Sequence, residues 1–227
     1  MHVRARLLLL VQGWQHSKHS WHKYIRFLGL PDDKRYFFWG LANIEEGSLP
    51  IALTCSKDIK RFLVISVDDL NFNIYLNYFC LGHKVHKKIK EICSKLKVAM
   101  AVEISRCNNI VFIGGSDTYD IEKGKPIISA ITLDEDMREI CTLELSEDSM
   151  RNIYSVKRIA GTNAVLVSGE KSICVLEFCH DASGKSESRF LEMKHLRNIH
   201  SQEIFRFAIA GREVLSICPA DNYIHKF

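Results

Sequence analysis

The sequence predicts an all-β protein built from consecutive units of four short antiparallel strands. An isoleucine followed by a turn and an apolar four-residue stretch recurs four times along the chain. Each copy follows a stretch rich in the aromatic and β-branched residues that suit a pleated, half-buried surface. The composition, 47% hydrophobic and 26% charged residues, is typical of a globular protein and argues against a disordered chain.

The repeat has a regular spacing. The isoleucines stand 60, 55 and 50 residues apart, at Ile44, Ile104, Ile159 and Ile209. Their apolar stretches are IALT at 51–54, IVFI at 110–113, AVLV at 164–167 and VLSI at 214–217. A polar turn and a third strand follow every copy, and REICTLEL at 138–145 and SRFLEMKH at 188–195 supply a fourth strand in two of them.

Four short antiparallel strands in about 50 residues form the blade of a β-propeller, in which each sheet hides its apolar faces against its neighbours. Over roughly residues 36–227 the chain resembles the WD40 or kelch class of repeat proteins. It lacks the Trp-Asp pair of WD40 repeats, and Gly82-His83 is its one Gly-His pair. An unrelated β-sandwich, or a mixed α+β domain with evenly spaced strands, is the alternative.

The units predict a propeller-like fold with three full four-stranded blades, a partial fourth blade and a short inserted helix. We expect an N-terminal segment at 1–35 and repeats at 36–97, 98–151, 152–202 and 203–227. The last repeat lacks an outer strand. Either a strand from residues 5–30 closes the ring, or the chain is part of a larger propeller, and we expect the partial propeller.

The first repeat is the longest, and its excess lies at 82–97. Five apolar residues there, Val85, Ile89, Ile92, Cys93 and Leu96, have the spacing of one helix face. Six lysines surround that face: Lys84, Lys87, Lys88, Lys90, Lys95 and Lys97. They are the candidate partner-binding residues. The alternatives are a solvated helix face, or an outer strand whose lysines protect a sheet edge.

No sequence motif predicts catalysis, and we expect no catalytic, cofactor-binding or metal-binding residues. The chain has no GxSxG, no phosphate-binding GxxxxGK[ST], no HExxH and no Gly-rich dinucleotide loop. Two groups of possible zinc ligands lack a second paired cluster: His16, His19 and His22, and Cys80, His83 and His86. We interpret both as chance placements.

The segment GGSDTYDIEKGK superficially resembles a calcium loop, with carboxylates at Asp117, Asp120 and Glu122. It lacks the alternating oxygen ligands and the closing glutamate of an EF-hand. We therefore expect a link between two strands, with Gly114, Gly115 and Gly124 in turn conformations.

The remaining composition indicates the cellular setting. Eight cysteines lie singly in apolar segments, which favours reduced thiols over a disulfide framework. The apolar stretch at Leu7–Val11 is shorter than the roughly 7 to 15 residues of a secretory signal, and no apolar run approaches the roughly 20 residues that span a bilayer. We expect a cytoplasmic or nuclear protein.

We expect a non-catalytic interaction scaffold of the WD40-like type, which presents turn loops and the 84–97 insertion to a protein partner. The alternative is a module that binds nucleic acid or anionic lipid through the lysines. A net charge of +4 is too small to favour nucleic acid by itself.

Overall fold

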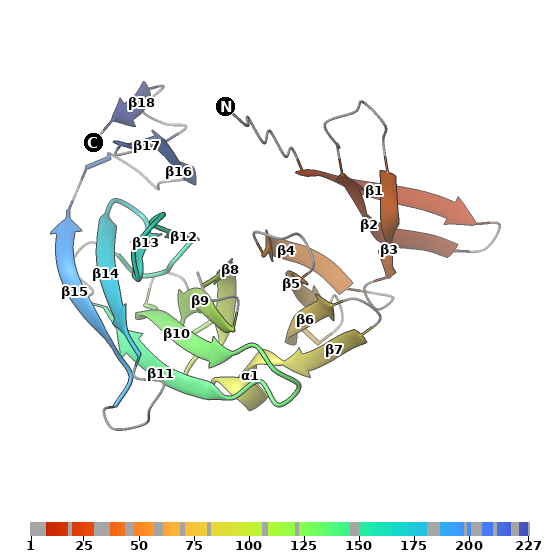
Figure 1. Ribbon diagram of the computed structural model, residues 1–227, viewed down its shortest axis with the longest axis horizontal. Helices are drawn as coiled ribbons and strands as arrows, with labels where there is room; N and C mark the ends of the chain where they lie inside the picture. The colour runs from red at the N-terminus through yellow and green to blue at the C-terminus, as the bar shows by residue number, and fades with distance from the viewer. Residues whose placement is uncertain are drawn as a thin grey trace.

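The computed structural model is propeller-like, with separate antiparallel sheets arranged side by side in an arc (Figure 1). The structure describes residues 8–17, 20–29, 37–43, 48–56, 61–68, 71–80, 83–105, 109–120, 123–145, 150–180, 187–197, 199–200, 206–210, 213–218 and 223–226. For residues 8–50, and for some of residues 206–226, the description is limited to the backbone.

Three of the sheets have four strands each, in the order in which the strands follow along the chain. We number these blades 1 to 3. Blade 1 consists of β4 (Ser48–Cys55), β5 (Arg61–Asp68), β6 (Ile74–Cys80) and β7 (His83–Lys88). Blade 2 consists of β8 (Val98–Ile104), β9 (Ile110–Ser116), β10 (Pro126–Thr132) and β11 (Glu139–Glu144). Blade 3 consists of β12 (Ser155–Arg158), β13 (Ala164–Ser168), β14 (Ile173–Cys179) and β15 (Arg189–Leu196).

Two further sheets have three described strands each. The N-terminal sheet consists of β1 (Leu8–Ser17), β2 (Ser20–Gly29) and β3 (Phe37–Asn43). The C-terminal sheet consists of β16 (Arg206–Ala210), β17 (Glu213–Cys218) and β18 (Tyr223–Lys226). Among the described strands, β1 pairs with β2 and not with the C-terminal sheet. The alternative to the expected partial propeller, an N-terminal strand that closes the ring, is therefore not seen in these strands.

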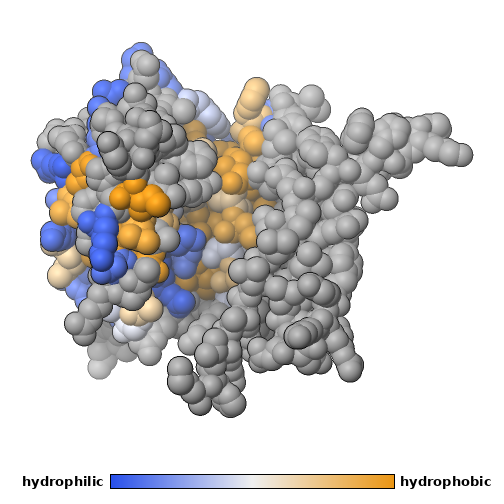
Figure 2. All heavy atoms as spheres, turned by 90° about the horizontal axis from the view of Figure 1, so that it is seen from above, coloured by the Kyte–Doolittle hydropathy of each residue, from blue (hydrophilic) through white to orange (hydrophobic). Residues whose placement is uncertain are grey.

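Each blade presents its first strand to the centre of the arc and its last strand to the outside (Figure 1). The first strands of neighbouring blades contact one another, β4 with β8, β8 with β12, and β12 with β16. Seen from above, apolar side chains are visible in the recess between the sheets, whereas polar side chains gather toward the outside (Figure 2).

The core lies between the blades, and adjacent residues of one strand face different neighbours. Ile127 of β10 packs in a cluster with Leu63 and Leu76 of blade 1. Ile128, the next residue, packs with Val165 and Leu176 of blade 3. Both isoleucines are fully buried, and burying such a side chain contributes about 1.5–3 kcal/mol. A middle blade is therefore apolar on both faces, which explains its continuous apolar strands.

Blade 3 packs on the C-terminal sheet in the same way. Leu166 and Ile173 lie in one cluster with Phe207, Ile209 and Val214. The repeat predicted in the sequence is thus a repeat of two-faced sheets, in which each sheet needs its neighbours to bury its apolar surface.

Two sequence expectations are wrong in their local detail. The helix expected at 82–97 is limited to Ile89–Ile92, as α1, and His83–Lys88 is the outer strand of its sheet, which is the alternative that the sequence left open. The segment had helical apolar spacing, but Tyr75 to Cys80 on β6 offers a complete edge for pairing. In addition, β3 pairs with β2 and does not open blade 1, so the first four-stranded unit begins at Ser48.

The paired glycines also differ from the expectation. Gly114 and Gly115 lie inside β9 and are buried, not in a turn. A Cβ on Gly115 would overlap the backbone carbonyl of Val98, and a Cβ on Gly114 would overlap the side chain of Ile153. These glycines allow close approach of the backbone to its neighbours.

Two further expectations concern the cellular setting. None of the described cysteines Cys55, Cys80, Cys93, Cys141, Cys174 and Cys179 forms a disulfide bond. In the described part of the chain, no helix has the length and hydrophobicity to cross a membrane.

The packing between blades 2 and 3 predicts a large difference between two adjacent residues of β15. Phe190 is 6% exposed and contacts Phe112 and Phe178 edge-on or tilted, whereas Leu191 is 37% exposed. We expect Phe190→Ala to lower the free energy of unfolding by about 3–5 kcal/mol. Leu191→Ala is the matched control, with an expected loss below about 1 kcal/mol. Urea unfolding measures both, and equal losses would contradict this account of the core.

Candidate interaction sites

The six candidate lysines occupy three different elements. Lys84, Lys87 and Lys88 lie on β7, Lys90 lies on α1, and Lys95 and Lys97 lie in the link from α1 to β8. Because a strand alternates its side chains and a link follows no such rule, these lysines do not form the single helical surface that the spacing predicted.

Four of the six lysines contact neighbouring structure, and one of them, Lys88, lies 6.0 Å above the ring of Tyr75. The Lys87 ammonium donates a hydrogen bond to the backbone carbonyl of Asp136, at 2.5 Å. Lys95 forms an exposed ion pair with Glu144 of β11, at 3.5 Å. Lys84 lies 6.0 Å above the ring of Phe79. The Lys87 contact joins blade 1 to blade 2, and the Lys95 ion pair fastens the link after α1 to blade 2.

Lys88 and the two remaining lysines, Lys90 and Lys97, line one hollow between blades 1 and 2. We call it the lysine pocket; its volume is about 240 Å³. Its other lining residues are Asn73, Ile74, Ile89, Ser94, Leu96 and Tyr119. Among the described residues no carboxylate lines it, and none of the three lysines forms an ion pair with another described residue. The described lining of the pocket is therefore basic.

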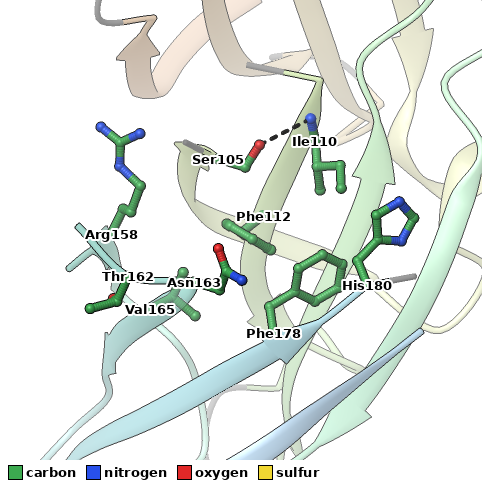
Figure 3. Close-up of a pocket in the computed structure, with 9 residues that line it drawn as sticks. All are labelled: Ser105, Ile110, Phe112, Arg158, Thr162, Asn163, Val165, Phe178 and His180. Carbon is green, nitrogen blue, oxygen red and sulfur yellow. Dashed lines mark hydrogen bonds between the residues drawn. The ribbon is translucent and has the colours of Figure 1, made fainter. Parts of the chain in front are cut away.

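A second hollow of about 340 Å³ lies between blades 2 and 3, and we call it the inter-blade pocket (Figure 3). Its apolar lining comes from Ile110, Phe112, Val165 and Phe178. Its polar lining comes from Ser105, Arg158, Thr162, Asn163 and His180. An apolar wall with a few polar groups is the usual composition of a binding pocket.

The inter-blade pocket lies at the strand ends opposite to the lysine pocket. It is built from the turns after β8, β12 and β14, whereas the lysine pocket is built from the turns after β5 and β9 and from the link after β7. Successive connections of an antiparallel sheet alternate between its two ends. The two pockets therefore serve two different faces of the arc.

Several polar groups of the inter-blade pocket are already used by the turns. The Ser105 hydroxyl accepts a hydrogen bond from the Ile110 N–H, at 3.2 Å (Figure 3). The Thr162 hydroxyl donates to the Ile159 carbonyl and accepts from the Ala164 N–H, at 3.0 Å in each case. His180 lies within 2.8 Å of the Ser188 hydroxyl and stacks on Phe178. The Asn163 amide points toward Phe112, whereas the Arg158 guanidinium lies at one side of the pocket and points away from the apolar lining (Figure 3).

Sequence reasoning missed this pocket, although a signal was present. Ser105 follows Ile104, and Thr162 and Asn163 follow Ile159, so these residues occupy the same turn in two successive repeats. Comparing the polar residues of the turn that follows each repeat isoleucine could have found them.

A chain of polar contacts joins the first strands of the three blades near the centre of the arc. Glu103 of β8 lies 3.4 Å from the Thr54 hydroxyl of β4 and 3.5 Å from the Lys157 ammonium of β12. Burial raises the pKa of Glu103 above its usual value, and the charges of Lys157 and Arg158 partly oppose this increase. Burial therefore makes the charged form of the Glu103 carboxyl energetically costly.

The histidine groups and the carboxylate segment for which the sequence predicted no metal are placed as follows. His16 and His22 lie on strands β1 and β2, where side chains are outside the description, and His19 lies outside the described residues. The ring of His86 bonds to the Asn77 side chain at 2.7 Å and stacks on Tyr75. Asp117 accepts from the Lys125 N–H, and Asp120 pairs with Lys123, as a link between strands requires, while Glu122 is outside the description.

The fold has solved relatives, all distant in sequence. A candidate 6-phosphogluconolactonase from Bacteroides uniformis superposes with a TM-score of 0.55 at 11% identity, over 94% of this chain and 64% of its own. A second, from Bacteroides fragilis, gives 0.58 at 9% identity over 94% and 64%. The β-propeller domain of Cps50 (Swd1) from Myceliophthora thermophila gives 0.58 at 9% identity over 97% and 86%. The chain thus spans less than two thirds of the length of the two bacterial proteins.

These likenesses show a propeller-like fold and, at such low identity, no shared function. No protein-family profile matches the sequence, and no curated protein matches it.

The raised pKa of Glu103 predicts a pH-dependent effect of Glu103→Gln. The folded protein holds this proton to a higher pH than the unfolded chain does, so the wild type loses stability as pH rises through that interval. Glutamine does not titrate. We expect the stability of Glu103→Gln relative to the wild type to increase from about pH 4 to about pH 7.

Urea unfolding at several pH values measures this difference. Glu144→Gln, which removes an exposed carboxylate, is the control for general charge effects. A relative stability of Glu103→Gln that falls with rising pH would show that the pairing with Lys157 outweighs the cost of burial.

Proposed function

We propose that the chain is a non-catalytic, propeller-type protein-interaction module that binds a peptide segment of a partner. A bulky apolar side chain of the peptide enters the inter-blade pocket, and an acidic residue beside it pairs with Arg158. The observation that carries this proposal is the pocket itself, with four apolar lining residues and a basic group at one side.

The size and chemistry of the pocket support this ligand. A volume of about 340 Å³ lies at the small end of the range of about 300–1,000 Å³ for ligand pockets, which suits one large side chain. Buried anchor residues of this kind carry most of the binding energy of protein interfaces. An arginine beside an apolar pocket favours a carboxylate, because its planar guanidinium can donate two parallel hydrogen bonds.

The same groups argue for recognition over chemistry. The Ser105 and Thr162 hydroxyls are held by backbone groups of their own turns, so they are poorly placed to act as activated nucleophiles. Two fold relatives are candidate 6-phosphogluconolactonases, which makes lactone hydrolysis the activity to test first. Turnover of 6-phosphogluconolactone that is lost on His180→Ala would contradict the non-catalytic role.

A peptide selection tests the proposed role. A random peptide library displayed on phage is selected on the wild-type protein, and the enriched peptides are synthesised and measured by calorimetry. We expect peptides that share an aromatic or large aliphatic residue next to an acidic one. Asn163→Trp, which fills the pocket from its exposed edge, and Arg158→Ala should each weaken binding by about tenfold or more.

Lys171→Trp is the matched control, because it adds an indole to an exposed turn at the opposite strand ends. It should bind the selected peptides as the wild type does. If selection gives no shared pattern, or if Asn163→Trp binds the peptides unchanged, the inter-blade pocket is not a peptide site.

A second candidate function is binding of nucleic acid through the lysine pocket. Three lysines among the lining residues, with no carboxylate in the described lining, suit a phosphate group, and Tyr119 at the rim is 63% exposed and could stack on a base. This candidate uses the opposite face, so it can be tested separately.

For this candidate we expect a fluorescent single-stranded oligonucleotide to bind with an affinity that falls steeply with salt. The triple variant Lys88→Glu, Lys90→Glu, Lys97→Glu should abolish this binding. A control variant with the same net charge changes Lys84, Lys123 and Lys171 to Glu. Equal losses in both variants would show general attraction by charge, and vesicles containing phosphatidylserine in place of the oligonucleotide would identify a lipid ligand.

A further inference from the structure

Three possible metal ligands of blade 3 converge near its outer edge: Cys174 on β14, and Glu192 and His195 on β15. One ligand atom from each, a sulfur, an oxygen and a nitrogen, lies within 4.8 Å of the other two. The His195 Nδ1 and a Glu192 carboxylate oxygen are 3.6 Å apart. The sequence did not suggest this group, because its members come from two strands with no metal-ligand spacing.

An irregularity in strand pairing brings the three side chains to one face. His195 stands opposite Cys174, and Glu192 stands opposite Leu176, whereas Lys194 stands opposite Val175. The register shifts there, so Met193 is an extra residue in β15. In a regular strand, residues three positions apart point to opposite faces. The bulge cancels this alternation and places Glu192 on the same face as His195.

The burial of the group is graded toward solvent. Cys174 is fully buried, the His195 side chain is 5% exposed, and the Glu192 side chain is 39% exposed. A small ion could therefore enter past Glu192 and meet the imidazole and the thiol at the inner end. An entry path of this kind is one of the requirements of a metal site.

We propose that Cys174, Glu192 and His195 form a zinc site with three protein ligands. A thiolate, an imidazole and a carboxylate are the ligand types that zinc takes in proteins, and water or a ligand fills the fourth tetrahedral position. Zinc bonds of about 2.0–2.3 Å place neighbouring ligand atoms about 3.3–3.8 Å apart. The group needs only a small contraction of flexible side chains to reach this geometry.

Without metal, the thiol and the imidazole of the group have defined protonation states. Burial and the neighbouring Glu192 raise the pKa of Cys174 to about 12, so without metal the thiol keeps its proton. Burial lowers the pKa of His195, helped by Arg197 and partly opposed by the charge of Glu192, and the net decrease favours the neutral imidazole that a metal needs. When zinc binds, the Sγ–Zn bond forms, the S–H bond breaks, and the proton leaves to solvent, with no change of oxidation state.

Cobalt titration of the whole protein, first treated with a chelator, tests the site. Cobalt(II) reports a thiolate ligand through a sulfur-to-metal absorption band, and zinc should displace it. We expect one equivalent to bind. Cys174→Ser should remove the band, and Glu192→Gln and His195→Gln should each weaken metal binding by more than about 100-fold. Replacing a residue that only hydrogen-bonds to a metal ligand already lowers metal affinity by about 10–100-fold.

Cys93→Ser is the matched control, because Cys93 is also fully buried but lies in the cluster between blades 1 and 2. It should bind cobalt as the wild type does. If Cys174→Ser fails to fold, Glu192→Gln decides the question, since it changes only the partly exposed ligand. No uptake of cobalt or zinc, or uptake that is unchanged in Glu192→Gln and Cys174→Ser, would show that these residues form an ordinary polar contact.

Discussion

The two-sided burial of each middle blade is the constraint on which the rest of the structure depends. A sheet such as β8–β11 has apolar side chains on both faces, Ile127 toward blade 1 and Ile128 toward blade 3. Such a sheet cannot be stable alone, because both of its apolar faces would be exposed to water. The arc follows from repeating this unit, and so do the pockets, which lie where the turns of adjacent blades diverge beyond their packed faces.

The propeller-like class of fold could be predicted from the sequence, because strand type and unit length are local properties. The strands of blades 2 and 3 are the segments that the repeat indicated, from VAMAVE to SRFLEMKH. The phase of the first unit could not be predicted. Phe37–Asn43 has the same strand-forming character as an opening strand, and only its pairing with β2 assigns it to the N-terminal sheet.

The candidate sites were less predictable than the fold. The lysines of 84–97 were found by composition, but the spacing of Val85, Ile89 and Ile92 fits a helix better than the strand that exists at His83–Lys88. Tertiary pairing with β6 outweighed that pattern. The inter-blade pocket and the group around Cys174 depend on which turns and strands become neighbours in space, and a single sequence carries little information about this.

The polar contacts of Glu103 give the arc a property that its apolar packing lacks. Hydrophobic contacts have little directional preference, so packed sheets could slide over one another at a small cost in free energy. The contacts from Thr54 through Glu103 to Lys157 are directional and cross two boundaries at the inner strands. These contacts fix the position of each blade relative to the next at the centre of the arc. A partner that drew Lys157 away from Glu103 would remove this constraint, and the blades could then shift relative to one another while their apolar faces stay in contact.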